Sequence, residues 1–283
     1  MLKILSIKYG SISVLFLILG ILSFSVHSRA KESDKNNLSN LPSKPRSEKE
    51  ILELVSISDG KQTITLPLRV FIINDLQLEK REVKMKTWIT PKEIADTILP
   101  EINRIWKPAG IQWELESIIV QPSAKLTNKA EHIQYIQNSV RTAKKQRFPE
   151  RTIKIQELCG KQNQHPKIHN LYFFPYLGQT YQGFARMRGN TAYLGVWTDK
   201  YSKGKQPPKK ALLTEPEPMQ RGSLGRTAAH ELGHNLGLIH PDKPTQKIFN
   251  RVMGGRKQGY QLTGEEIKIA RSFALKRAKN ITN

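Results

Sequence analysis

The chain has 283 residues, of which 38% are apolar, and it carries 46 lysines and arginines against 24 aspartates and glutamates. This length suits one large domain or two small ones, and the apolar content supports a folded core but excludes a protein with many membrane spans. The formal charge of +22 favours anionic partners, and the single cysteine, Cys159, excludes an intramolecular disulfide and zinc sites built from paired cysteines.

The first thirty residues have the composition of a targeting segment. Lys3 and Lys8 precede a charge-free stretch, and small residues follow at Ser28 and Ala30. This order is typical of a signal peptide cleaved after Ser28 or Ala30. Residues 9–28 are also long enough to span a bilayer, so an uncleaved membrane anchor is the alternative. Both interpretations predict a secreted or extracytoplasmic protein.

Residues 31–59 are predicted to be a polar linker or a short propeptide in front of one folded domain, residues 60–283. The part over residues 31–50 holds two prolines and few apolar side chains. Such a composition cannot bury enough surface to fold and indicates disorder. Order is expected to begin near Ile51.

Strand-like segments recur along the folded region. Residues 63–75 are rich in β-branched side chains and predict a buried strand, in which Pro67 indicates an edge position or a bulge. Residues 111–120, 170–178 and 190–198 predict three further strands.

The segment between the first two strands predicts a helix over residues 90–106. Thr90 is a good N-cap, Glu93 completes a capping box, and isoleucines recur at helical spacing. Pro100 is expected to kink this helix, and Gly110 is expected to end the unit.

Further helices are expected over residues 130–145, over 224–236 behind an N-cap at Ser223, and from Thr263 toward the C-terminus. Strands and helices therefore mix in one unit. We predict the α/β (α+β) class, with a twisted mixed sheet of about four to five strands.

The segment HELGHNLGLIH, residues 230–240, holds three of the seven histidines of the chain. On a helix, His230 and His234 project to nearly the same side. Gly237 accepts a left-handed backbone conformation at little cost, so the helix can stop there and the chain can turn sharply. His240 can then return to the same point in space, and the three imidazoles converge.

Three imidazole ligands with an open fourth position fit one catalytic zinc ion. Glu231 lies beside His230 and can border the metal without binding it. Zinc lowers the pKa of a bound water to about 7 and polarises a carbonyl, and Glu231 can act as the general base that activates this water. The residues therefore predict hydrolysis of a peptide bond, with His230, His234 and His240 as metal ligands.

The complete pattern HExxHxxGxxH resembles that of the metzincin clan of zinc endopeptidases. In that clan a methionine-containing turn lies beneath the metal, and the segment NRVMGG places Met253 thirteen residues after His240. The resemblance implies that Met253 and Gly237 support the site without binding the metal. It also implies that the strand at residues 190–198 forms the rim along which substrate pairs as an added strand.

The resemblance implies a metzincin-like zincin fold over residues 60–283. An upper part, residues 60–240, would carry the active-site helix, and a lower part, residues 241–283, would carry the methionine turn and the C-terminal helix.

Within the clan the chain looks nearest to matrixin-like and serralysin-like catalytic domains, but it departs from both. Pro241 follows the third histidine as in serralysins, whereas the glycine-rich calcium repeats are missing, and no acidic loop predicts structural Ca²⁺. Gly255 stands where astacins and serralysins carry a tyrosine. The propeptide cysteine of matrixins and the cysteine cluster of archaemetzincins are also missing.

The predicted function is that of an exported, monomeric zinc metalloendopeptidase acting on proteins or peptides. The lysine- and arginine-rich segments 141–154 and 199–210 would favour acidic substrates or an anionic surface. The alternative is an exported zinc-site protein that binds anionic cell-surface or matrix polymers without proteolysis, and cell-wall peptides are a further substrate class left open. No nucleic-acid motif is present, so no specific nucleic-acid binding is predicted.

Overall fold

The computed structural model describes residues 41–57, 63–80, 83–138, 150–178, 182–197, 223–241, 250–254 and 259–283. The predicted targeting segment, the basic segment 199–210 and most of the basic segment 141–154 lie outside the described residues. None of the described helices has the length and apolar content needed to cross a bilayer.

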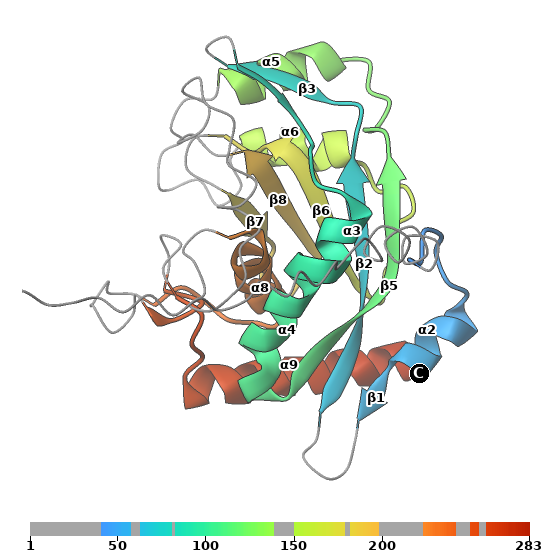
Figure 1. Ribbon diagram of the computed structural model, residues 1–283, viewed down its shortest axis with the longest axis vertical. Helices are drawn as coiled ribbons and strands as arrows, with labels where there is room; N and C mark the ends of the chain where they lie inside the picture. Colours follow the sequence, from blue (N-terminus) through green and yellow to red (C-terminus); the bar gives the residue numbers. More distant parts are fainter. Residues whose placement is uncertain are drawn as a thin grey trace, which may run out of the picture.

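A six-stranded mixed sheet forms the centre of the domain (Figure 1). The strands β2, β5, β6 and β8 are parallel, whereas β1 and β7 pair antiparallel with β2 and β8. The order across the sheet is β5-β2-β6-β8-β7, and β1 pairs with the start of β2. The predicted α/β class is thus confirmed, and the described part of the chain places six strands in the sheet instead of four to five. Their bounds are β1 Ser56–Ile57, β2 Ile64–Ile73, β5 Ile111–Gln121, β6 His169–Tyr176, β7 Gly183–Ala185 and β8 Thr191–Trp197.

Pro67 lies inside β2, at a point where one neighbouring strand ends and another begins. On that side of β2, pairing with β1 ends at Thr65 and pairing with β6 begins at Leu68. A residue without an N–H is tolerated at such a gap in the ladder.

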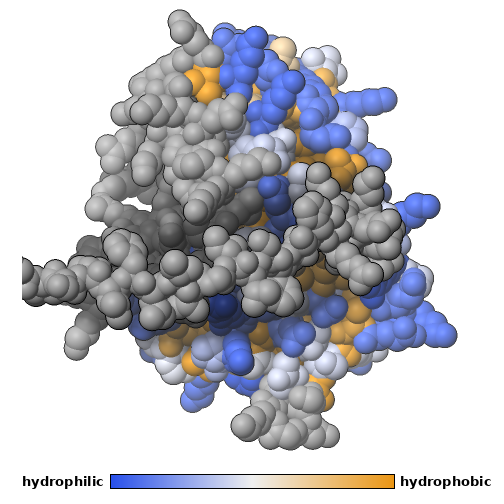
Figure 2. Space-filling model, in the orientation of Figure 1, coloured by the Kyte–Doolittle hydropathy of each residue, from blue (hydrophilic) through white to orange (hydrophobic). Residues whose placement is uncertain are grey.

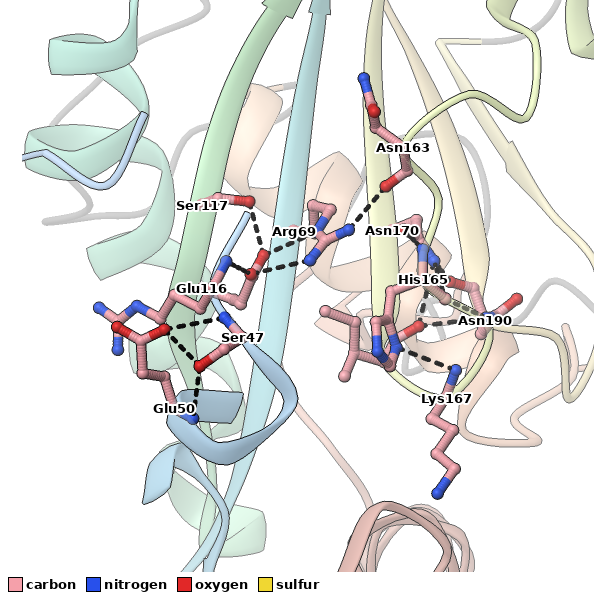
Figure 3. A network of polar contacts seen from close by, with 12 residues as sticks. Ser47, Glu50, Arg69, Glu116, Ser117, Asn163, His165, Lys167, Asn170 and Asn190 are labelled. Atoms are coloured by element: carbon pink, nitrogen blue, oxygen red, sulfur yellow. Dashed lines mark hydrogen bonds and ion pairs between the residues drawn. The ribbon is translucent and has the colours of Figure 1, made fainter. Parts of the chain in front are cut away.

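A bulge between β2 and β5 explains a buried ion pair. The register passes from Leu68 opposite Leu115 to Arg69 opposite Ser117, so Glu116 is an extra residue in β5. Glu116 accepts two hydrogen bonds from the Arg69 guanidinium, at 2.7 and 2.8 Å (Figure 3). Burial acts to raise the pKa of Glu116, but hydrogen bonds from Arg69 and Ser117 lower it below its usual value.

Residues 41–57, here called the N-terminal clasp, are ordered. Helix α2 (Glu48–Leu54) begins at Ser47, whose side chain forms a capping box with Glu50. Ile51 is buried in a small cluster with Ile168 and Ile281. The expected disorder through residue 50 is therefore wrong for residues 41–50, because local capping and burial against distant parts of the chain stabilise them.

The N-terminal clasp also covers the outer edge of β5. The Ile118 backbone N–H donates to Pro42 O at 2.7 Å, and the Arg46 N–H donates to Glu116 Oε1 at 2.5 Å. The clasp therefore satisfies the backbone of an edge strand and the buried carboxylate beside it.

The helix predicted over residues 90–106 is present in three consecutive parts, α3 (Pro91–Glu93), the π-helical η1 (Ile94–Ile98) and α4 (Leu99–Trp106). The Thr90 capping box is confirmed. The expected disturbance at Pro100 takes the form of the π-helical segment directly before it. A short 3-10 helix, η2 (Lys107–Ala109), ends at Gly110, whose φ is +60°.

Helices cover both faces of the sheet. The β2–β5 connection carries α4, and the β5–β6 connection carries α5 (Lys129–Gln137) and α6 (Glu150–Cys159). These connections run in opposite directions, so right-handed crossovers place them on opposite faces. Helix α8 (Leu224–Asn235) packs on α4, and α9 (Gly264–Thr282) contacts β2 and η2 near the lower end of Figure 1.

A two-stranded hairpin, β3 (Gln77–Lys80) and β4 (Val83–Lys86), adds a second small sheet that the sequence pattern does not predict. The Trp197 indole N–H donates to Lys86 O at 2.7 Å and ties the hairpin to the end of β8. The described surface on the face seen in Figure 2 is largely hydrophilic, with apolar patches between the charged side chains.

Candidate metal centre

Helix α8 carries the first two histidines and begins where the sequence predicts. Ser223 Oγ accepts the backbone N–H of Arg226 as an N-cap, and the Ser223 hydroxyl donates to Glu101 Oε1 of α4 at 2.5 Å. One face of α8 is fully buried in the core and comprises Leu224, Ala228, Leu232 and Leu236.

Gly237 ends the helix in a left-handed conformation, with φ of +84°. The Leu238 N–H donates to Gly233 O at 2.9 Å, and the Gly237 N–H donates to His234 O at 3.0 Å. This pair of bonds is a Schellman motif, in which glycine is the preferred residue. The turn brings His240 back toward the helix.

The three histidine side chains meet at one point. His240 Nε2 lies 2.9 Å from His230 Nε2 and 3.2 Å from His234 Nε2. Nitrogen ligands at 2.0–2.1 Å from a tetrahedral zinc ion lie about 3.3 Å from one another, so this spacing suits an ion of that size. Within the described ranges, no other group of three or more histidine, cysteine or acidic side chains has such a spacing.

Backbone carbonyls fix the tautomers of the two helical histidines. His230 Nδ1 donates to Val252 O at 2.7 Å, and His234 Nδ1 donates to Leu238 O at 2.8 Å. Because a carbonyl can only accept, both rings carry the proton on Nδ1 and keep the Nε2 lone pair. Lone pairs directed at one another repel unless a cation lies between them, so this donor set fits a metal ion.

Burial also keeps these rings in the form that binds metals. Burial lowers the pKa of His234 to about 4, and the neighbouring His240 acts in the same direction. Burial, with His234 and Arg226 nearby, places the pKa of His230 well below its ordinary value. Neutral imidazoles are the ligand form, so the group is ready to bind a metal at neutral pH.

Glu231 is buried beside the histidines and faces strand β7. A β-carbon on Gly183 would lie 2.7 Å from both Cγ and Oε1 of Glu231, so only glycine leaves room for the carboxylate. Burial raises the pKa of Glu231 to about 8, and the charge of Arg226 acts in the opposite direction. A divalent cation on the histidines would further favour the carboxylate form.

Met253 is fully buried beneath α8. A β-carbon on Gly233 would lie 2.7 Å from Met253 Sδ, so the thioether fills the space under the turn that carries both helical histidines. The structure therefore brings Met253 to the site, and its supporting role stays a prediction.

The strand over residues 190–198 does not form the rim of the sheet. Strand β8 lies between β6 and β7, and β7 is the outer strand on that side within the described residues. The expectation that substrate pairs with β8 is therefore wrong, because a three-residue strand, too short to show alternation in the sequence, occupies that edge.

Two further residues that contact the site were not predicted from the sequence. Arg226 lies one helical turn before His230, and Val252 presents its carbonyl to that histidine. The sequence feature that could have indicated a role for Arg226 is its charge, because its neighbours at the start of the helix, LGRTAAH, are mostly small or apolar.

No protein-family model matches the chain, and no curated protein sequence matches it. Solved structures give weak similarities. One is described as a chaperone–substrate complex, at 13% identity over 76% of this chain and with a TM-score of 0.39. This chain spans about a third, 34%, of that one.

Two further structures match over nearly their whole length. The chain is similar to an archaemetzincin from Methanopyrus kandleri, at 16% identity over 78% of this chain and 99% of that one, with a TM-score of 0.39. It is also similar to a zinc-dependent peptidase from Methanocorpusculum labreanum, at 13% identity over 72% and 99%, with a TM-score of 0.38. Scores this low define no family, so the functional conclusion depends on the geometry of the site itself.

Proposed function

We propose that the protein is a zinc-dependent endopeptidase. One observation carries the proposal: the Nε2 atoms of His230, His234 and His240 converge beside the buried carboxylate of Glu231. Three neutral imidazoles are the ligands of a hydrolytic zinc site with an open position, and a carboxylate that does not bind the metal is the base that such a site uses.

A zinc ion held by the three histidines would supply Lewis acidity toward water and toward the substrate carbonyl. Glu231 would take the proton of the attacking water and deliver it to the leaving amine, as a general base and then a general acid. Its carboxylate is packed against Gly183, so it is held in one place for both transfers.

The edge of β7 is the surface along which we expect substrate to lie. Gly183 of this strand contacts Glu231, and within the described residues the strand pairs only with β8. An extended peptide that adds to the open side of β7 would therefore pass next to the carboxylate, in the mode of β-strand addition.

The test combines metal content with cleavage of a mixed peptide library, for the full chain and for Glu231→Gln. We expect one zinc per chain in both proteins and cleavage only by the parent. Zinc binding without cleavage by the parent would favour the alternative of a binding protein with a zinc site. Absence of zinc in the parent would contradict the proposal.

Membership in the metzincin clan, near its matrixin-like and serralysin-like groups, remains part of the proposal and is supported by the motif and Met253. Export is likewise proposed, from the order of charges and apolar residues in residues 1–30. A preference for acidic substrates is proposed from the net charge of +22. Cleavage of matched acidic and basic peptides at equal rates would contradict the proposed preference for acidic substrates.

A further inference from the structure

We propose that Arg226 is a positioning residue, which holds the turn at Val252 against α8 and thereby orients His230 for metal binding. The inference rests on the proposed zinc site. It concerns a side chain that is not itself a metal ligand and that the hydrolytic chemistry above does not use.

Arg226 connects the metal-binding helix to the chain segment beneath it. The side chain is only 4% exposed and lies one helical turn before His230, on the same side of α8. Its Nη2 donates to Val252 O at 2.8 Å, and its Nε donates to Gly259 O at 2.8 Å. These two carbonyls are seven residues apart in the chain, so one guanidinium ties Val252 to Gly259.

The Val252 carbonyl is shared with a metal ligand. His230 Nδ1 donates to the same oxygen at 2.7 Å. The Val252 oxygen has two lone pairs, and it accepts one hydrogen bond from Arg226 and one from His230. The position of this oxygen sets the ring orientation of His230, and Arg226 sets the position of the oxygen. Met253 is the next residue, so the same clamp also places the thioether under Gly233.

The chemistry of arginine suits this role. Its planar guanidinium presents donors in a fixed geometry and can hold two carbonyls at once, whereas a lysine presents one compact charge. A buried cation is costly unless it is paired. Burial lowers the pKa of Arg226 to about 10, and the nearby Glu231 and Glu101 act in the opposite direction, so the guanidinium keeps its charge at neutral pH.

The experiment measures metal affinity in the full chain, by competition with a chelator, for the parent, Arg226→Met and Arg226→Lys. Loss of a group that orients a ligand typically weakens metal affinity about 10- to 100-fold. We expect such a loss in Arg226→Met and a smaller one in Arg226→Lys. Cobalt-substituted protein should show altered visible absorption bands in Arg226→Met, because the ligand geometry changes.

Arg271→Met is the matched control. Arg271 Nη1 also donates to a backbone carbonyl, that of Ala109, at 2.7 Å. This control should lose stability but keep the parental metal affinity and cobalt spectrum. A folded Arg226→Met with parental affinity and spectrum would overturn the inference alone, and if that variant does not fold, an unchanged Arg226→Lys would do so. A parent that binds no metal would overturn the zinc site and the inference together.

Discussion

Gly183 contributes to the site only by leaving space. A β-carbon there would lie 2.7 Å from Glu231 Cγ, inside any normal contact. We predict that Gly183→Ala displaces the carboxylate and lowers kcat/KM for peptide cleavage about 10- to 100-fold, which is a partial loss of the roughly 10²- to 10⁴-fold that a general base contributes. The metal content should stay at the parental level, because the three atoms nearest to this β-carbon all belong to Glu231 and not to a metal ligand.

The measurement compares kcat/KM and zinc content with those of Gly264→Ala. Gly264 opens α9, and a β-carbon there meets nothing within 4 Å. The control should therefore behave like the parent in both assays. Unchanged cleavage by Gly183→Ala would show that Glu231 tolerates displacement or is not the base.

Gly237 contributes to the site through the conformation of its backbone. Its φ of +84° costs a residue with a β-carbon about 1–2 kcal/mol, and that carbon would also lie 2.6 Å from Phe273 Cε2. We predict that Gly237→Ala lowers the free energy of unfolding by at least this amount. It should also weaken zinc affinity, because the turn that returns His240 moves. Denaturant unfolding and chelator competition measure the two effects, and parental zinc affinity would contradict the second.

At the scale of elements, the contact between α4 and α8 contains a buried titrating group. Burial raises the pKa of Glu101 to about 7, against hydrogen bonding from Ser223 and the charges of Arg104 and Arg226. The folded state therefore holds this proton more tightly than the unfolded state. The contribution of Glu101 to stability is full below the ordinary carboxyl pKa of about 4.5, falls as the pH rises through about 7, and is constant above that.

We predict that the parent loses about 3 kcal/mol of unfolding free energy from this group between pH 4.5 and pH 8, and that Glu101→Gln lacks this loss. Glu231 also has a raised pKa and contributes in the same direction, so the difference between the two proteins isolates Glu101. Denaturant unfolding at both pH values provides the test. Parallel pH profiles of the two proteins would show that Glu101 does not titrate in this range.

At the scale of the whole molecule, the N-terminal clasp and the candidate site lie at opposite edges of the sheet. The clasp covers β5, whereas Glu231 lies beside β7. Residues 41–57 therefore stabilise the domain without blocking the metal, which differs from the behaviour expected of an inhibitory propeptide.

We predict that deleting residues 1–57 lowers the free energy of unfolding by about 2–5 kcal/mol through the loss of Ile51 alone. Deletion of residues 1–40 keeps the clasp and is the matched control. Activity per folded molecule should not rise in the longer deletion. A gain in activity there, with the shorter deletion unchanged, would support the propeptide interpretation for residues 41–57.

Local patterns in the sequence were sufficient to predict where several helices begin and where the helix with the first two histidines ends. The capping box at Thr90, the start of α9 at Thr263 and the turn at Gly237 are confirmed, because caps and turns depend on neighbours a few residues away. The convergence of the three histidines follows from helix geometry and one left-handed residue. These features could be predicted without knowledge of the rest of the fold.

Tertiary structure alone decided which distant residues complete the site. Strand β7 could not be predicted from the sequence, because three residues show no periodicity. Gly183 matters to the site only through its contact with Glu231, which lies on another element. The partners of Arg226 lie 26 and 33 residues further along the chain. The N-terminal clasp is ordered by contacts with β5 and Ile281. Such contacts depend on how the elements pack, and a residue type or spacing in one segment does not encode what another segment will place against it.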